Sequence, residues 1–167
     1  MESNNQIEQP KSRHSLVTIV IVVGILITII INVLTLLSCW SMIGYAEWEF
    51  EPFLHKPDIA KAHRMVFFVL LAQMFVAIVS TVFIVVYYVK LLGWKKRGFW
   101  GYAITSVVAM VADVVMSSYI TKAFSKVEVD VSNNIPIQIA WTLATIVLLY
   151  VVLQIKKNGV RYWKQLE

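Results

Sequence analysis

The chain has 167 residues, of which 59% are hydrophobic and 15% are charged. A soluble domain has about 45–50% apolar and about 25% charged residues, so this composition excludes an ordinary soluble domain and indicates lipid as the solvent. The net charge is +5, but the basic residues flank long apolar runs, as they do at membrane surfaces. We therefore expect the lipid bilayer as a partner and no nucleic acid.

Four apolar runs are long enough for the hydrocarbon core of a bilayer, which needs about 20 residues. The expected spans are residues 16–39, 65–89, 99–121 and 135–155. The first run exceeds the roughly 7–15 residues of a signal-peptide core, so we expect it to be retained as a span. Residues 1–15 are polar, and we expect a disordered cytoplasmic N-terminus there.

The Lys and Arg residues predict the orientation, because they concentrate on the cytoplasmic side of a membrane. Five lie on the side opposite the two termini. Ten lie on the side of the termini: Lys11, Arg13, Lys90, Lys95, Lys96, Arg97, Lys156, Lys157, Arg161 and Lys164. The predicted fold class is therefore an all-α membrane protein, an up-down-up-down bundle of four transmembrane helices with both termini cytoplasmic.

The connections between the spans differ in length and character. The link 90–98 is short, so the second and third spans are expected to be antiparallel neighbours. The segment 40–64 is expected to hold a short interfacial helix and turns. The segment 122–134 alternates valine with acidic residues and is expected to lie extended on the bundle. Residues 156–167 are expected to form a cytoplasmic tail on the membrane surface.

Aromatic residues cluster near the ends of the spans, as is typical of membrane–water interfaces. At the inner interface we expect Tyr87, Tyr88, Trp94, Trp100 and Tyr102. At the outer interface we expect Trp40, Tyr45, Trp48 and Tyr119.

Asp113 is an acid inside the third span, where insertion of a charge costs about 2.5–3.5 kcal/mol. Ser106, Ala109, Asp113 and Ser117 recur at helical spacing. Small and polar side chains in membrane helices pack against other helices rather than lipid. We therefore expect this stripe to face the interior of the bundle.

The other spans carry matching faces. Gly24 and Thr28 share a side of the first span with Asn32. With about 1.5 Å of rise per residue, Asn32, Gln73, Asp113 and Thr142 all lie roughly 4–7 Å outward of their span midpoints. The sequence thus predicts one intramembrane polar layer. Further residues on these faces are Thr35, Ala77, Ser80, Gln138 and Thr145.

Two interpretations of the layer stay open. In the first, the layer connects the helices by hydrogen bonds, and a neutral Asp113 donates to Asn32 or Gln73. In the second, Asp113 is a proton or cation site, the default reading of an intramembrane acid.

The segment after the first span contains several residues of metal-binding type: Glu47, Glu49, Glu51, His55, Asp58 and His63. Their spacing matches no metal motif, so we expect no metal there and no cofactor. The chain also lacks a nucleophile–base pattern and a phosphate-binding glycine loop. We therefore expect that it is not an enzyme.

The hairpin Leu91-Leu92-Gly93-Trp94-Lys95-Lys96-Arg97-Gly98-Phe99 and the tail Lys156-Lys157-Asn158-Gly159, followed by Trp163 and Gln165-Leu166, resemble those of small bacterial four-span inner-membrane proteins of unassigned function. The resemblance implies a multi-pass protein of the bacterial inner membrane. It implies no functional residue.

Three functions follow, in order of preference. The first is a structural or accessory component that packs with a membrane partner or with further copies of itself. The second is a small oligomeric transporter or channel, linked to protons or cations through Asp113. The third is a membrane enzyme or metal-binding protein that uses the segment after the first span.

Overall fold

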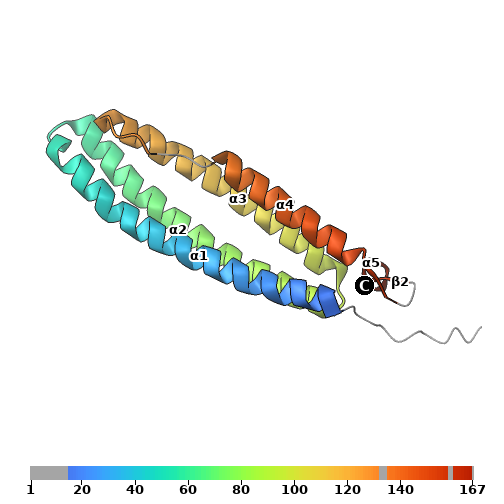
Figure 1. The fold of residues 1–167 in the computed structure, drawn as a ribbon. Helices are drawn as coiled ribbons and strands as arrows, with labels where there is room; N and C mark the ends of the chain where they lie inside the picture. The colour runs from blue at the N-terminus through green and yellow to red at the C-terminus, as the bar shows by residue number, and fades with distance from the viewer. Residues whose placement is uncertain (1–14, 132–134, 158–159, 167) are drawn as a thin grey trace, which may run out of the picture.

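The computed structural model describes residues 15–131, 135–157 and 160–166. It contains four helices long and apolar enough to cross a membrane, which confirms the number of spans expected. The helices are α1 (Ser15–Phe50), α2 (Pro57–Leu92), α3 (Lys96–Phe124) and α4 (Ile135–Leu153) (Figure 1). The expectation for residues 1–14 lies outside the described residues.

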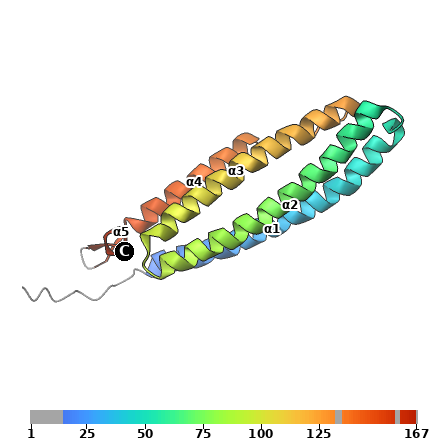
Figure 2. The ribbon, with the colours of Figure 1, turned by 180° about the vertical axis from the view of Figure 1, so that it is seen from behind.

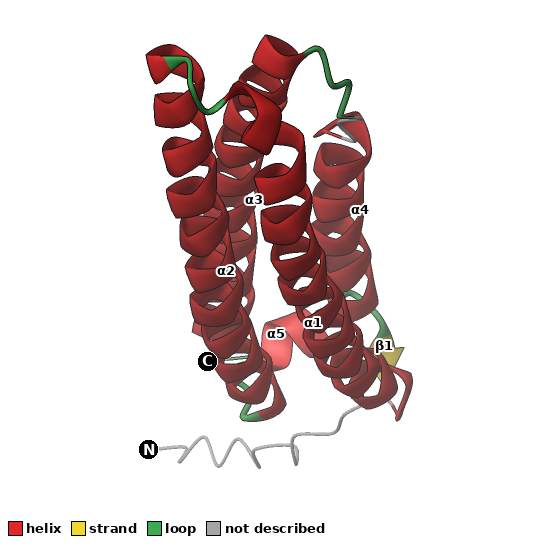
Figure 3. Ribbon diagram, turned by 90° about the vertical axis from the view of Figure 1, so that its left-hand side faces the viewer, coloured by secondary structure: helices red, strands yellow, loops and turns green. Residues whose placement is uncertain are grey.

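Short elements occupy the two ends of these helices (Figure 3). One end, which we call the η1 end, holds two 3₁₀ turns, η1 (Glu51–Phe53) and η2 (Ser125–Val127). The opposite end, which we call the α5 end, holds the connection between α2 and α3, an antiparallel pair of two-residue strands, and a short helix. These last elements are β1 (Lys156–Lys157), β2 (Val160–Arg161) and α5 (Tyr162–Gln165).

Helices α1 and α2 are longer than the spans expected from hydropathy. Each has 36 residues, or about 54 Å of helix against about 30 Å of hydrocarbon. The expected loop at 40–64 is therefore wrong. Only residues 51–56 interrupt the α-helices there. Pro57 at the first position of α2 and Asp58 in its first turn favour a helix start at this point.

An aromatic cluster holds the η1 end together and explains why these helices continue. Phe50 of α1 and Phe124 of α3 are fully buried, and their rings meet edge to face with centroids 5.1 Å apart. Tyr45 stacks on Phe124 at 5.7 Å, and His63 of α2 lies 5.5 Å from the ring of Phe50. Aromatic pairs of this kind add about 0.5–1.5 kcal/mol beyond burial, so packing sustains helix where hydropathy has fallen.

The segment after α3 lies against the same cluster. Val127 is buried in this cluster, and Val129 and Val131 pack against the cluster, while Glu128 and Asp130 are exposed. The alternation of valine and acid therefore separates a packed side from a solvent side. This arrangement agrees with the expected extended segment as far as residue 131, where the described part of that segment ends.

At the α5 end, the C-terminal segment packs beneath the helices. The side chain of Tyr162 is only 1% exposed, and its hydroxyl donates to the Leu91 carbonyl at 2.6 Å. The ring of Trp94, a residue with φ of 63°, lies 4.8 Å from that of Tyr162. The segment expected as a tail on the membrane surface thus packs against the helices, since Tyr162 and Leu166 are buried in the core.

The helices are not packed equally. Helix α2 lies along both α1 and α3, whereas α4 packs mainly on α3 and touches α1 sparingly. In Figures 1 and 2, α1 with α2 and α3 with α4 form two layers that meet near their ends. The outward faces carry exposed large aliphatic and aromatic side chains on all four helices, as expected for surfaces that contact lipid.

The contact of α2 with α3 depends on Gly98. A Cβ atom at this position would lie 2.6 Å from the Tyr87 carbonyl oxygen and 2.7 Å from the Leu91 nitrogen, both backbone atoms. We predict that Gly98→Ala lowers the free energy of unfolding by about 1–3 kcal/mol, as overpacking does. Thermal unfolding of the purified protein in mild detergent measures the change.

Gly44→Ala in α1 is the matched control, since a Cβ there meets nothing within 4 Å. Alanine favours helix over glycine by about 0.5–1 kcal/mol, so this variant should be as stable as the wild type or more so. Equal melting temperatures for the two variants would contradict the close approach at Gly98.

Candidate functional site

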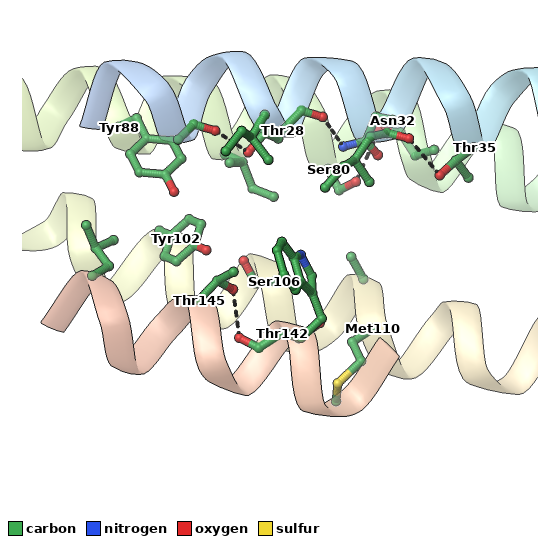
Figure 4. A pocket seen from close by; sticks show the side chains of 18 of the residues that line it. Thr28, Asn32, Thr35, Ser80, Tyr88, Tyr102, Ser106, Met110, Thr142 and Thr145 are labelled. Carbon is green, nitrogen blue, oxygen red and sulfur yellow. Dashed lines mark hydrogen bonds between the residues drawn. The ribbon is translucent and has the colours of Figure 1, made fainter. Parts of the chain in front are cut away.

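A central cavity of about 560 Å³ lies between the two layers and is lined by all four long helices (Figure 4). Small-molecule sites typically have about 300–1,000 Å³. Its walls combine aliphatic and aromatic side chains with polar ones. The polar residues are Thr28, Asn32, Thr35, Gln73, Ser80, Tyr88, Tyr102, Ser106, Asp113, Gln138, Thr142 and Thr145.

The structure brings most of the candidate residues to this cavity. The layer residues Asn32, Gln73, Asp113 and Thr142 all line it. The small and polar residues Gly24, Thr28, Ser106 and Ala109 line it too. Ser117 does not, and lies instead in a neighbouring cavity.

That neighbour, the η1-side cavity, has a volume of about 440 Å³. Its walls include Cys39, Ser117 and Thr121, which lie towards the η1 end. Five residues line both cavities: Ile31, Thr35, Gln73, Asp113 and Gln138. Asp113 therefore stands where the two cavities meet.

Asp113 is held by amide groups from two other helices. The Gln73 Nε2 group of α2 donates to Asp113 Oδ1, and the side chain of Gln138 on α4 also hydrogen-bonds the carboxyl. The Gln138 Oε1 atom is buried and has no hydrogen-bond partner among the described atoms. The amide N–H groups are donors, and a carboxyl oxygen accepts from them whether or not the acid is protonated.

Of the two partners expected for Asp113, Asn32 or Gln73, the described hydrogen bonds show Gln73, with its amide as the donor. Asn32 donates instead to the Thr28 carbonyl at 2.8 Å, and Thr28 to the Gly24 carbonyl at 2.8 Å. Thr145 likewise donates to the Thr142 carbonyl at 2.9 Å. Side chains that bond within their own helix satisfy themselves without joining helices, so these residues contribute little cohesion to the bundle.

The site contains two kinds of residue that sequence reasoning missed. The first is Gln138, which the sequence placed on the inward face of α4, whereas Thr142 was assigned to the intramembrane polar layer. The second kind is aromatic: Tyr88 and Tyr102, expected from sequence only as inner-interface residues, are each 5% exposed and line the central cavity. Gly24 could have indicated the inward position of Tyr88, because a Cβ atom at Gly24 would lie only 2.8 Å from the Tyr88 hydroxyl oxygen.

The site contains an acid and no base. No Lys, Arg or His lines either cavity within the described part of the chain. The other titratable groups there are Cys39 of α1, Tyr88 of α2 and Tyr102 of α3. An ionised Asp113 would thus have no protein counter-charge in a medium where an unpaired charge is costly.

The central cavity has an opening at its side. Clusters of buried side chains pack at the η1 and α5 ends of the bundle. Ile19 and Ile27 of α1 and Trp141 and Leu148 of α4 line the cavity and are also exposed. The opening between α1 and α4 therefore has an apolar rim that faces the lipid.

The residues of metal-binding type after the first span do not converge. Glu47 and Glu49 belong to α1, whereas Asp58 and His63 belong to α2. Among residues that the structure describes, no three His, Cys, Asp or Glu side chains lie close enough to hold a metal ion. The metal-binding alternative gains no support.

The chain matches no model of a known protein family, no curated protein and no solved structure.

We predict that Asp113→Asn keeps the stability of the wild type, because asparagine reproduces the neutral acid. Its oxygen accepts from Gln73 and its amide donates to Gln138. Asp113→Leu leaves both amides unpaired and should cost about 1–2 kcal/mol. Thermal unfolding in detergent measures both variants. A loss from Asp113→Asn as large as that from Asp113→Leu would contradict a neutral carboxyl.

Proposed function

We propose that this chain is a small membrane transporter or channel in which Asp113 binds and releases a proton or a cation. The observation that carries the proposal is the position of Asp113 where two cavities meet. A transport site must be reached from both sides of a membrane. One cavity extends from Asp113 towards each end of the bundle, which supports such a path.

The open cavity favours this role over the accessory role ranked first from sequence, although Gln73 of α2 does join Asp113 of α3. A layer that only joins helices would pair its side chains across them. Here Thr28, Asn32 and Thr145 bond within their own helices and border an open volume. The accessory role stays a prediction, and it would return if Asp113 proved dispensable.

We further propose an up-down-up-down bundle with both termini in the cytoplasm of a bacterium, in its inner membrane. The charge asymmetry supports this orientation: Lys90, Lys95, Lys96 and Arg161 lie at the α5 end. A homo-oligomer is the expected assembly, since four spans rarely enclose a pathway alone.

The orientation predicts the activity of a C-terminal fusion. A reporter that works only in the cytoplasm, fused after Glu167, should be active. The reason is the ratio of ten to five Lys and Arg residues on the two sides. The same reporter fused to a truncated chain that ends at Lys126 serves as the control and should be inactive. An inactive, well-expressed full-length fusion would contradict the orientation.

The transport role predicts a proton flux that depends on Asp113. The purified protein is reconstituted in liposomes that contain a pH-sensitive dye, and a pH gradient is imposed with and without a membrane potential. We expect Asp113→Asn to lower the protein-dependent flux at least tenfold, because the amide cannot carry the proton. Asp130→Asn makes the same change at an exposed acid of the η1 end and should keep the flux.

A flux in Asp113→Asn equal to that of the wild type would overturn the proton-linked role. Comparison with Asp130→Asn separates this result from a general effect of lost charge.

A further inference from the structure

We propose that the central cavity binds a lipophilic organic cation, which enters from the bilayer between α1 and α4 and replaces the proton on Asp113. This inference rests on the proposed function and names the class of its substrate. Four properties of the cavity support it: its charge, its hydrogen-bonding groups, its aromatic walls and its opening.

The charge of the cavity selects the sign of the ligand. Asp113 is the acid of the site, and no Lys, Arg or His lines either cavity in the described part of the chain. An anionic ligand would therefore find no counter-charge in a medium of low dielectric constant. A cation would supply the positive charge that an ionised Asp113 lacks.

The hydrogen-bonding groups match the head of such a ligand. Gln73 donates to one oxygen of the carboxyl, which would stabilise the carboxylate when the cation is bound. The buried Gln138 Oε1 atom, which has no partner among the described atoms, would turn its partial negative charge towards the positive head of the ligand.

Aromatic rings provide the rest of the recognition. Trp141 of α4, Tyr88 of α2 and Tyr102 of α3 line the cavity, and the rings of Tyr88 and Tyr102 lie 5.0 Å apart. The faces of such rings attract organic cations. Ile27 and Leu148 add aliphatic wall at the opening, which suits the hydrocarbon part of the ligand.

The opening selects a ligand that dissolves in the membrane. Its rim carries Ile19, Ile27, Trp141 and Leu148, all exposed, so a molecule enters from lipid without passing a polar barrier. This apolar opening favours a lipophilic cation over a hydrated metal ion.

The exchange balances charge and protons. The neutral Asp113 carboxyl loses its proton to water through the η1-side cavity, and the carboxylate pairs with the arriving cation. One positive charge enters the site for each proton that leaves, so the occupied and empty sites are both neutral. Cys39, Tyr88 and Tyr102 are the other titratable groups that face these cavities.

Tetraphenylphosphonium is the probe, because its charge does not change with pH. Its binding to the purified full-length chain in mild detergent is measured by equilibrium dialysis. We expect saturable binding, the release of one proton per cation into weakly buffered solution, and affinity that increases with pH. Asp113→Asn should weaken binding at least tenfold while its melting temperature stays that of the wild type.

Two controls complete the experiment. Tetraphenylborate has the same shape with the opposite charge, and we expect no saturable binding of it. Trp141→Ala removes a ring from the wall and should weaken phosphonium binding several-fold without changing proton release per cation. Phosphonium binding that is unaffected by Asp113→Asn, or equal binding of the borate, would overturn the inference.

The outcome is separable from that of the proposed function. A proton flux that depends on Asp113, together with no phosphonium binding, would leave transport standing and remove the organic cation as substrate. Loss of both the flux dependence and the binding would remove both.

Discussion

A carboxyl group in the middle of a bilayer has no water to satisfy it, so the protein must supply its hydrogen bonds. Gln73 from α2 and Gln138 from α4 meet Asp113 of α3, and three helices are thereby brought to one point. Helix α2 reaches α3 closely because Gly98 has no side chain. Buried clusters that contain aromatic rings pack the helices together towards both ends.

The spans and their inward faces could be predicted because both depend on local pattern. A run of about 20 apolar residues identifies a membrane helix, and residues three or four apart share a face. The ends of α1 and α2 could not be predicted in this way. Whether helix continues beyond the lipid depends on contacts between residues far apart in sequence, such as Phe50 with Phe124.

The composition of the site was predictable, but its pairing was not. Depth estimated from sequence is uncertain by about one helical turn, which is the separation of Gln138 from Thr142. Asn32 has a carbonyl of its own helix within reach and so does not need Asp113. Tyrosine near the end of a span suggests an interface by composition, but Tyr88 is drawn inward by the space beside Gly24.

The opening of the central cavity constrains what the protein does. Because the cavity opens sideways between α1 and α4, the apolar phase around the protein can enter it. A hydrocarbon chain from the bilayer would fill the apolar walls, but it would leave Gln138 Oε1 unpaired. A molecule with both a hydrocarbon body and a polar, positively charged head satisfies the walls and the acid together.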